Sequence, residues 1–224
     1  MPSVLLLTGE KSMKIKWLGH ASFLVKTKGL NIYIDPYAGE YTEKADLILA
    51  SHEHGDHCAL GKIDEARKAD TVIVTSRANA TKLTGRGEVL SLEPGESREV
   101  RGIKLIGAEA HNTQKFRSPG VPFHPEGIQV AFIIESEGKR IYHAGDTDPL
   151  PSMNELGPLD VAMLPIDGHF TMTPAEAIEA ATRIKPKLVI PMHWRDQNVE
   201  EFKKNLEASG VKVRIPKETE EIEL

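Results

Sequence analysis

The chain has 224 residues, of which 40% are hydrophobic and 27% are charged, and it contains one cysteine, Cys58. This length suits one well-buried domain and is short for two catalytic domains. The net charge of -5 disfavours a nucleic-acid partner, because non-specific binding to phosphate backbones depends on clustered Lys and Arg. A lone cysteine cannot form an intrachain disulfide, so we predict a protein of the reducing cytoplasm.

Residues 1–8 contain a short apolar run without a basic region before it or a small-residue cleavage site after it. This pattern is not that of a signal peptide, and the run is too short to span a bilayer. We therefore predict no membrane association. Residues 1–12 are interpreted as an N-terminal extension or a short strand, ahead of a second start at Met13.

The first part of the chain has the composition of a strand meander. Residues 14–18, 22–27 and 31–34 are β-type runs separated by glycine-containing turns. Alternation of strand and helix begins at residue 45, and it predicts a strand at 45–50, a helix at 63–68, a strand at 71–75 and a helix at 77–83. Further strands are expected at 89–92 and 98–108.

Residues 116–127 are rich in proline and glycine. So many prolines and glycines prevent the backbone from forming the regular hydrogen bonds of a helix or a β-sheet, so we expect a surface loop beside His111. This loop is either a substrate-facing lid or a plain connection.

The second part of the chain also alternates. We predict a hairpin at 128–135 and 139–142, strands at 160–165, 187–193 and 211–215, and helices at 174–184 and 199–209. The helix at 174–184 has the strongest start, because Thr173 is a suitable N-cap, Pro174 fits the first helical position and Glu176 can complete a capping box.

The most informative motif follows the strand at 45–50 and has the form H-x-H-x-D-H, made by His52, His54, Asp56 and His57. Imidazole and carboxylate groups suit zinc, iron or manganese, and this spacing can direct donors toward two adjacent ions. The chain has nine histidines in all, so three within six residues are poorly explained as a chance surface loop.

Several strands, including the one at 45–50, end in side chains that can bind metal. They contribute Asp35, His52, His111, His143, Asp146 and His193. Because ligands of open α/β sheets gather outside the carboxyl ends of the strands, we expect these groups to meet at one rim. Strands that end in donors occur in both halves of the chain, which is typical of a pseudo-twofold duplication.

Together these motifs resemble the metallo-β-lactamase superfamily. Its small metal-dependent hydrolase branch, which includes ascorbate phosphate lactonases, is the more specific match. The residues that carry it are Trp17-Leu18-Gly19-His20, Ile34-Asp35-Pro36, His143-Ala144-Gly145-Asp146-Thr147, Phe170-Thr171-Met172 and Ile190-Pro191-Met192-His193. The resemblance implies an α+β fold, a four-layer αββα sandwich with two mixed β-sheets, as a single domain over residues 13–224. One departure is that Asp167-Gly168-His169 stands where the branch has paired glycines, and this bears on the substrate.

Position by position, the resemblance implies a site for two divalent metal ions. His52, His54 and His111 would bind one ion, Asp56, His57 and His193 would bind the second, and Asp146 would bridge them. Asp56 and Asp146 are the predicted catalytic carboxylates. Zinc is the first choice of metal, and manganese and iron are the alternatives. A metal-bridging hydroxide would attack the substrate, which we expect to be a small ester, lactone or phosphodiester.

The remaining polar groups near these motifs are given supporting roles. We expect His20 and His143 to orient other groups or to be satisfied structurally, and Asp35 to brace the ligand loop. His124 and His169 lie on predicted rim loops, where they either contact an anionic substrate group, protonate a leaving group or are simply solvated.

Two other functions stay open. An iron-dependent oxidoreductase, similar to sulfur dioxygenases, can use the same scaffold, whereas a diiron flavoprotein would have Glu in place of His54 and an added flavin domain. The other hypothesis is a metal-binding protein without catalytic activity. The expected partner is a small molecule, which can be anionic, and a homo-oligomer is compatible with the sequence.

Overall fold

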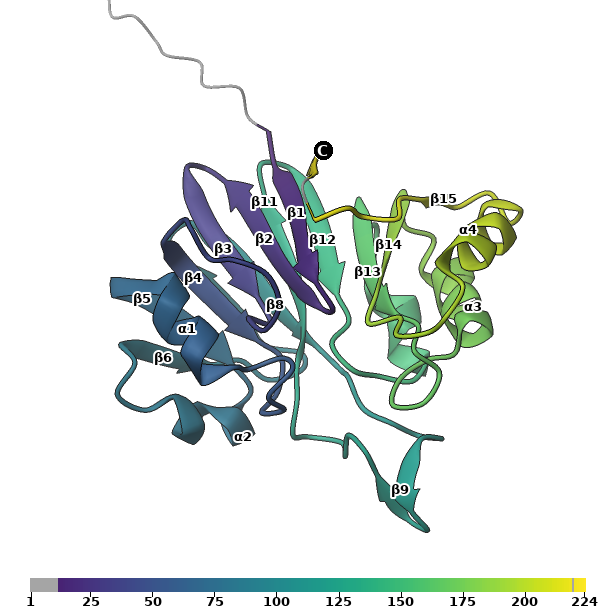
Figure 1. The fold of residues 1–224 in the computed structure, drawn as a ribbon, viewed down its shortest axis with the longest axis horizontal. Helices are drawn as coiled ribbons and strands as arrows, with labels where there is room; N and C mark the ends of the chain where they lie inside the picture. Colours follow the sequence, from purple (N-terminus) through teal and green to yellow (C-terminus); the bar gives the residue numbers. More distant parts are fainter. Residues whose placement is uncertain (1–11, 219) are drawn as a thin grey trace, which may run out of the picture.

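The computed structural model describes residues 12–218 and 220–224, so nearly all of the extension or strand predicted at residues 1–12 lies outside the described residues. Two seven-stranded β-sheets pack face to face, and helices cover the outer face of each (Figure 1). This is the four-layer αββα sandwich that the resemblance implied.

The first sheet has the order β16-β1-β2-β3-β4-β5-β6. Strands β1 to β3 form an antiparallel meander, and β3 to β6 are parallel. The strands are β1 (Lys14–Gly19), β2 (Ser22–Thr27), β3 (Leu30–Ile34), β4 (Ala45–Ala50), β5 (Arg67–Thr75), β6 (Glu88–Ser91) and β16 (Glu221–Glu223).

The second sheet repeats this plan in the order β15-β14-β13-β12-β11-β8-β7. Strands β7, β8, β11 and β12 are antiparallel, and β12 to β15 are parallel. The strands are β7 (Ser97–Val100), β8 (Ile103–Ala108), β11 (Ala131–Ser136), β12 (Lys139–His143), β13 (Val161–Pro165), β14 (Leu188–Met192) and β15 (Lys212–Val213).

Two hydrophobic cores hold the layers together. The larger one lies between the sheets and continues under the second pair of helices, whereas a smaller one lies between the first sheet and its helices. Strand β4 is buried on both faces, because Leu47 and Leu49 belong to the larger core and Ile48 to the smaller one. The helical elements are α1 (Leu60–Ala66), α2 (Arg77–Ala80), η1 (Thr81–Leu83), η2 (Pro151–Glu155), α3 (Pro174–Ile184) and α4 (Val199–Glu207).

The start of α3 confirms the predicted capping box. Thr173 accepts from the backbone N–H of Glu176, and the carboxylate of Glu176 accepts from the backbone N–H of Thr173. Both bonds satisfy donors that the first turn of a helix leaves free.

Three predicted elements need correction. Helix α1 ends at Ala66 because Arg67 and Lys68 already belong to β5, where Arg67 is paired with Ala45. The strand predicted at 98–108 is two strands, since Arg101 (φ 52°) and Gly102 (φ 75°) form a tight turn between β7 and β8.

The third correction concerns residues 116–127, which were predicted to lack ladder hydrogen bonds. They contain a small hairpin of β9 (Phe116–Ser118) and β10 (Val121–Pro122), which projects beyond the sandwich (Figure 1). Proline is tolerated there because the pairing ends at Pro122.

Candidate metal centre

The loop that follows β4 is folded so that its polar side chains converge. Both His57 and Cys58 donate their backbone N–H to the carbonyl of His54, at 3.0 and 2.8 Å, which closes a tight turn. Asp35, at the end of the neighbouring β3, accepts from the backbone N–H of Ser51 at 2.7 Å and from its hydroxyl at 2.7 Å. Asp35 therefore braces the loop, as its position in the sequence suggested.

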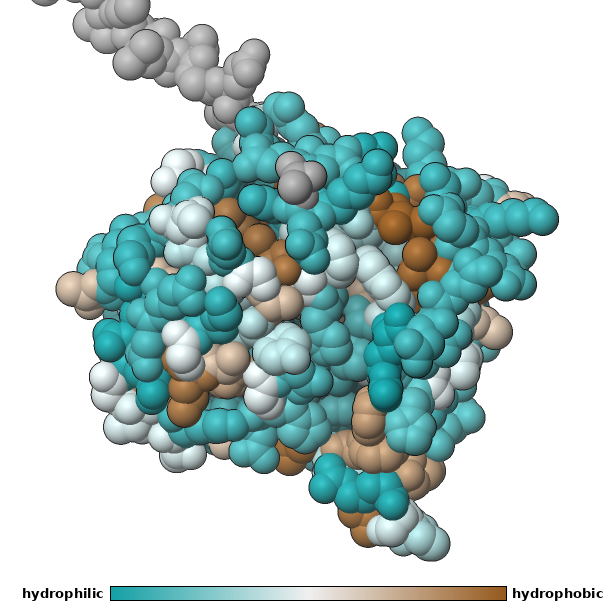
Figure 2. Space-filling model, viewed as in Figure 1, coloured by the Kyte–Doolittle hydropathy of each residue, from teal (hydrophilic) through white to brown (hydrophobic). Residues whose placement is uncertain are grey.

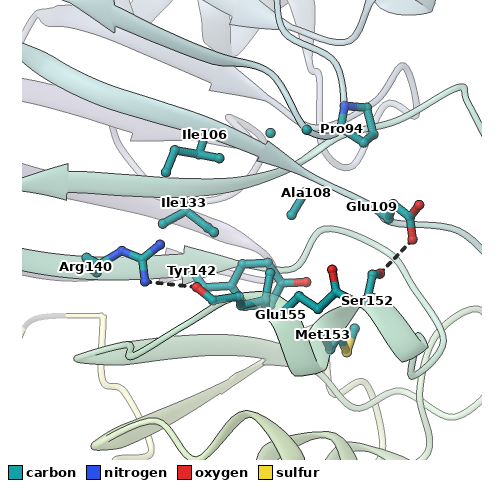
Figure 3. Close-up of a pocket in the computed structure, with 13 residues that line it drawn as sticks. Pro94, Ile106, Ala108, Glu109, Ile133, Arg140, Tyr142, Ser152, Met153 and Glu155 are labelled. Carbon is teal, nitrogen blue, oxygen red and sulfur yellow. Dashed lines mark hydrogen bonds between the residues drawn. The ribbon is translucent and has the colours of Figure 1, made fainter.

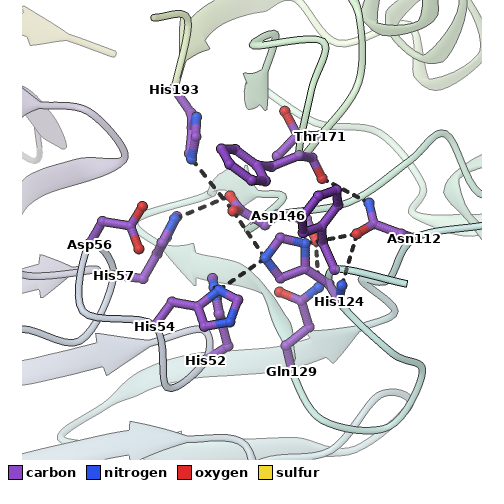
Figure 4. Close-up of polar contacts among 12 residues, drawn as sticks. His52, His54, Asp56, His57, Asn112, His124, Gln129, Asp146, Thr171 and His193 are labelled. Carbon is purple, nitrogen blue, oxygen red and sulfur yellow. Dashed lines mark hydrogen bonds and ion pairs between the residues drawn. The ribbon is translucent and has the colours of Figure 1, made fainter. Parts of the chain in front are cut away.

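A first group of donors consists of His52, His54 and His124, whose candidate ligand atoms lie within 4.8 Å of one another. Nδ1 of His54 is 3.1 Å from Nε2 of His52 and 3.1 Å from Nε2 of His124 (Figure 4). Three imidazole nitrogens at these separations can bind one transition-metal ion.

The structure brings His124 to this group, where the resemblance implied His111, and the role of His111 as a ligand stays a prediction. The backbone of His111 is held beside the loop after β12, because its N–H donates to Thr147 Oγ1 at 3.1 Å and its carbonyl accepts from Asp148 N at 3.0 Å. Among the described residues, no donor group includes the His111 side chain.

A second group consists of His20, Asp56, His57 and His193. Of these, His20 was expected only to support the site. In the structure its Nε2 is 3.4 Å from Asp56 Oδ2, and its ring centroid is 3.8 Å from that of His193. His20 therefore either adds a donor to this group or holds Asp56 in place.

Asp146 lies between the two groups (Figure 4). Its Oδ1 is 3.2 Å from His57 Nε2, and its Oδ2 is 3.3 Å from His124 Nε2 and 3.5 Å from His193 Nε2. Gly145 precedes it with a φ of 62°, a conformation that strains other residues, and a Cβ there would lie 3.3 Å from that of Ser51. Glycine thus lets this loop approach the ligand loop closely.

In His57 and His52, Nδ1 is bound to a neighbouring group, so that Nε2 faces the donor groups. His57 Nδ1 donates to Asp35 Oδ2 at 2.7 Å. The Ser51 hydroxyl gives its only proton to Asp35, so it must accept from His52 Nδ1, which is 3.0 Å away. Nε2 of each ring therefore turns inward, where His57 Nε2 lies 3.2 Å from Asp146 Oδ1 and His52 Nε2 lies 3.1 Å from His54 Nδ1.

Asn112 and Asp167 lie at the Nδ1 atoms of the other two histidines, His124 and His193. Asn112 Oδ1 accepts from His124 Nδ1 at 2.8 Å, and Asp167 Oδ2 lies 3.0 Å from His193 Nδ1. Carboxylates and amides behind ligand histidines fix the ring orientation and tautomer. Neither role was predicted, although Asp167 had been noted as a departure from the branch.

His143 and His169 lie outside the donor groups. His143 is satisfied structurally, since its Nε2 donates to the carbonyl of Ala21 at 2.9 Å and its Nδ1 accepts from Gly145 N at 3.3 Å. His169 is exposed, and its ring lies 4.5 Å from that of Phe170 and 5.4 Å from that of Phe123.

The electrostatics of the site favour cations. Burial lowers the pKa of His52 well below its ordinary value and that of His124 to about 4, so both rings are neutral. Burial opposes protonation of His57 and His193 too, but the charge of Asp146 outweighs it, raising the pKa of His57 and bringing that of His193 to about 9. Both raised pKa values favour protonated rings, and a bound metal ion would replace those protons.

A cavity of about 250 Å³ opens above these donors and is lined by His54, Asp56, Arg117, Phe123, His124, Asp146, Phe170 and His193. A second hollow, of about 350 Å³, lies between β8, β11, β12 and η2 (Figure 3). Its polar groups are largely paired with each other, as in the 2.6 Å bond from Ser152 to Glu109. It contains no donor group, so the smaller cavity is the candidate active site.

Comparison with known proteins identifies the family of this chain. The model of the beta-lactamase superfamily domain matches residues 14–193. The chain is 37% identical to a UPF0173 metal-dependent hydrolase of Thermococcus kodakarensis over 95% of its own length and 100% of the relative's. It is 33% identical to one of Methanopyrus kandleri, over 91% and 95% of the two lengths.

A solved structure is also similar. It is that of a suspected metal-dependent hydrolase from Parabacteroides distasonis, with a TM-score of 0.83 and 34% identity over 91% of this chain and 92% of the other. The fold and the histidine–aspartate site thus define a metal-binding αββα protein. The chain belongs to the metallo-β-lactamase superfamily, in the branch of metal-dependent hydrolases. No helix among the described residues is long and apolar enough to cross a membrane.

Proposed function

We propose that this protein is a dinuclear metal-dependent hydrolase that cleaves a small ester, lactone or phosphodiester. One observation carries the proposal: two groups of donor side chains, about half of them fully buried, face each other across a single carboxylate, that of Asp146. Two cations at short separation repel each other, and an anion between them offsets that repulsion. This arrangement is suited to two ions more than to one.

The donors present fit such ions. His57 Nε2, His20 Nε2 and Asp146 Oδ1 are buried without a hydrogen-bond partner among the described residues. Unpaired buried polar atoms are costly, and coordination would satisfy them together. Nitrogen and carboxylate ligands suit zinc first, with manganese and iron as alternatives.

The assignment of donors follows from the distances. His52, His54 and His124 would hold one ion, Asp56, His57 and His193 would hold the other, and Asp146 would contact both. Bound there, divalent ions lower the pKa of a water toward ~7 and polarise a carbonyl or phosphoryl oxygen. No separate Ser or Cys nucleophile is required.

The protein's own groups position this chemistry. Asp35 holds the tautomer of His57 and connects through Ser51 to His52, so one buried carboxylate orients donors of both groups. Phe123 and Phe170, whose ring centroids are 4.8 Å apart, line the cavity above the donors and limit the access of water. The exposed edge of the site, at Asp56, remains open to substrate.

The test is the metal content and activity of protein purified without chelator. We expect about two ions per chain by elemental analysis and hydrolysis of at least one of 4-nitrophenyl acetate, dihydrocoumarin and bis(4-nitrophenyl) phosphate. Asp146→Asn keeps the shape of the side chain but removes the bridging charge, so it should lose at least one ion and about a hundredfold or more in turnover.

His169→Ala serves as the matched control, because His169 lies outside the donor groups, and it should keep both ions. A content of one ion that does not rise on metal addition would contradict the dinuclear site. Iron with oxygen consumption and no hydrolysis would favour the oxidoreductase instead.

A further inference from the structure

The wall of the candidate active site contains one arginine, Arg117, which belongs to β9. Arg117 lines the cavity together with Phe123 and Phe170, and its Nη2 donates to the carbonyl of Phe123 at 2.9 Å. Its guanidinium carbon lies 5.9 Å from the centre of the Phe123 ring. The hairpin thus presents a cation at the edge of the cavity. The hydrogen bond to the carbonyl of Phe123 fixes the direction of the guanidinium group.

Arg117 has no acidic partner among the described residues. Most arginines of this acidic chain do have one within 4.0 Å, namely Arg67, Arg86, Arg101, Arg140, Arg183 and Arg214. The two carboxylates that line the same cavity, Asp56 and Asp146, are assigned to the metal ions in the proposed function. An anion entering the cavity would therefore meet a guanidinium whose other donors are unused.

A second arginine, Arg195, lies near Phe170 and is less suitable for binding an anion. Arg195 lies 5.3 Å from the centre of the Phe170 ring, but it lines an adjacent hollow that also contains Asp167 and Asp196. These carboxylates would repel an anion there. Arg117 is therefore the residue to which we assign recognition.

We propose that the substrate carries an anionic oxyacid group, a carboxylate or a phosphate, separated from the scissile bond by a short apolar spacer, and that Arg117 binds this group. The apolar spacer would lie against Phe123 and Phe170, which line the same cavity as Arg117 and the donors. Planar guanidinium donors bind carboxylate and phosphate in a forked geometry that lysine does not reproduce. The inference rests on the proposed function for the bond that is cut and for the assignment of Asp56 and Asp146 to metal ions.

A pair of esters that differ in one charge tests this specificity. We would measure kcat/KM of the metal-loaded protein for 4-nitrophenyl hydrogen adipate and for its methyl ester. The protein should prefer the anionic ester, and Arg117→Ala should reduce the ratio of the two kcat/KM values about tenfold, the usual effect of one charged hydrogen bond. Arg117→Lys keeps the charge and should restore the ratio only in part.

Arg98→Ala is the matched control, because Arg98 is also exposed and without an acidic partner among the described residues, but lies on β7 outside the cavity. It should leave the ratio unchanged. Metal content, measured for each variant, separates loss of recognition from disturbance of His124, which follows the same hairpin. Equal use of the two esters by the unmodified protein would overturn the assignment of an anionic substrate.

A second readout needs no turnover. Phenylglyoxal modifies accessible arginines, and peptide mass spectrometry gives the rate at Arg117 and Arg98 in the same sample. Benzylphosphonate should slow modification of Arg117 and leave Arg98 unaffected, whereas benzyl alcohol should protect neither. Unchanged modification of Arg117 by benzylphosphonate would overturn the anion site. If neither ester is cleaved but Arg117 is protected, the proposed esterase chemistry fails and the anion site stands.

Discussion

His111 and His124 lie on either side of the β9–β10 hairpin, and among the described residues only His124 belongs to a donor group. His111 follows a strand closely and fits the rule that ligands sit at strand ends, and the resemblance selected it for that place. The structure pairs Asn112 with His124 instead: Asn112 N donates to the carbonyl of His124 at 2.8 Å, and Asn112 Oδ1 accepts from His124 N at 2.9 Å. This pairing brings back a histidine from beyond the hairpin, and no local pattern encodes it.

The H-x-H-x-D-H motif is local in sequence, so the convergence of its side chains could be expected without knowledge of the fold. A tight turn that begins at His54 gathers its side chains. Asp167 is the opposite case. Its Oδ1 accepts from His169 N at 2.6 Å and Phe170 N at 2.8 Å while Oδ2 faces His193, so its role depends on where β14 ends.

His124 and His111 provide a direct comparison of the two assignments. His124→Ala removes one of three imidazoles from the first donor group and should lower affinity for that ion at least about tenfold, with loss of turnover. His111→Ala should change metal content little. Both proteins would be dialysed against graded free zinc and analysed for bound metal. Retention of full content in His124→Ala with loss in His111→Ala would restore the original assignment.

At the scale of elements, α3 was predictable because its start is defined by adjacent residues. Thr173, Pro174 and Glu176 satisfy or remove the free donors of the first turn, which needs no tertiary information. The β9–β10 hairpin was not predictable from its proline and glycine content. Figure 2 shows apolar residues at its projecting end, where Phe116 and Val121 are each 45% exposed.

The capping box gives a stability prediction for α3. Thr173→Ala removes the acceptor for Glu176 N and should lower the free energy of unfolding by about 1 kcal/mol. Thr182→Ala is the control, since its hydroxyl donates to the carbonyl of Ile178 on the exposed side of the helix and caps nothing. Urea unfolding of the three proteins measures the difference. A similar loss in both variants would mean that the cap contributes nothing specific.

At the scale of the whole molecule, the two sheets are near repeats of one plan. The β2–β3 and β11–β12 hairpins turn at Lys28-Gly29 and Glu137-Gly138, all with positive φ. The two turns also touch, because Thr27 Oγ1 lies 2.8 Å from Ser136 Oγ. The sequence suggested this duplication through donors at strand ends in both halves. The metal site lies at the opposite ends of these strands, and its donors come from loops of both sheets.

Metal ions at such a position should connect the sheets, so their removal should lower the melting temperature. The effect should depend on pH. In the metal-free protein the pKa of His193 is about 9 against an ordinary 6.5, so its protonation contributes stability that is complete below pH 6.5 and lost as the pH rises through 9. From this shift the loss is on the order of 3 kcal/mol. His57, whose pKa is also raised, acts in the same direction.

The expected outcome is therefore a gap between metal-loaded and chelator-treated protein that widens from pH 6.5 to pH 9. Metal ions compete with the protons on His57 and His193, so a higher pH favours metal binding as it weakens the metal-free state. Differential scanning calorimetry at several pH values, with and without EDTA, measures the gap. A gap that is constant or narrows over this range would show that the two histidines do not exchange protons for metal.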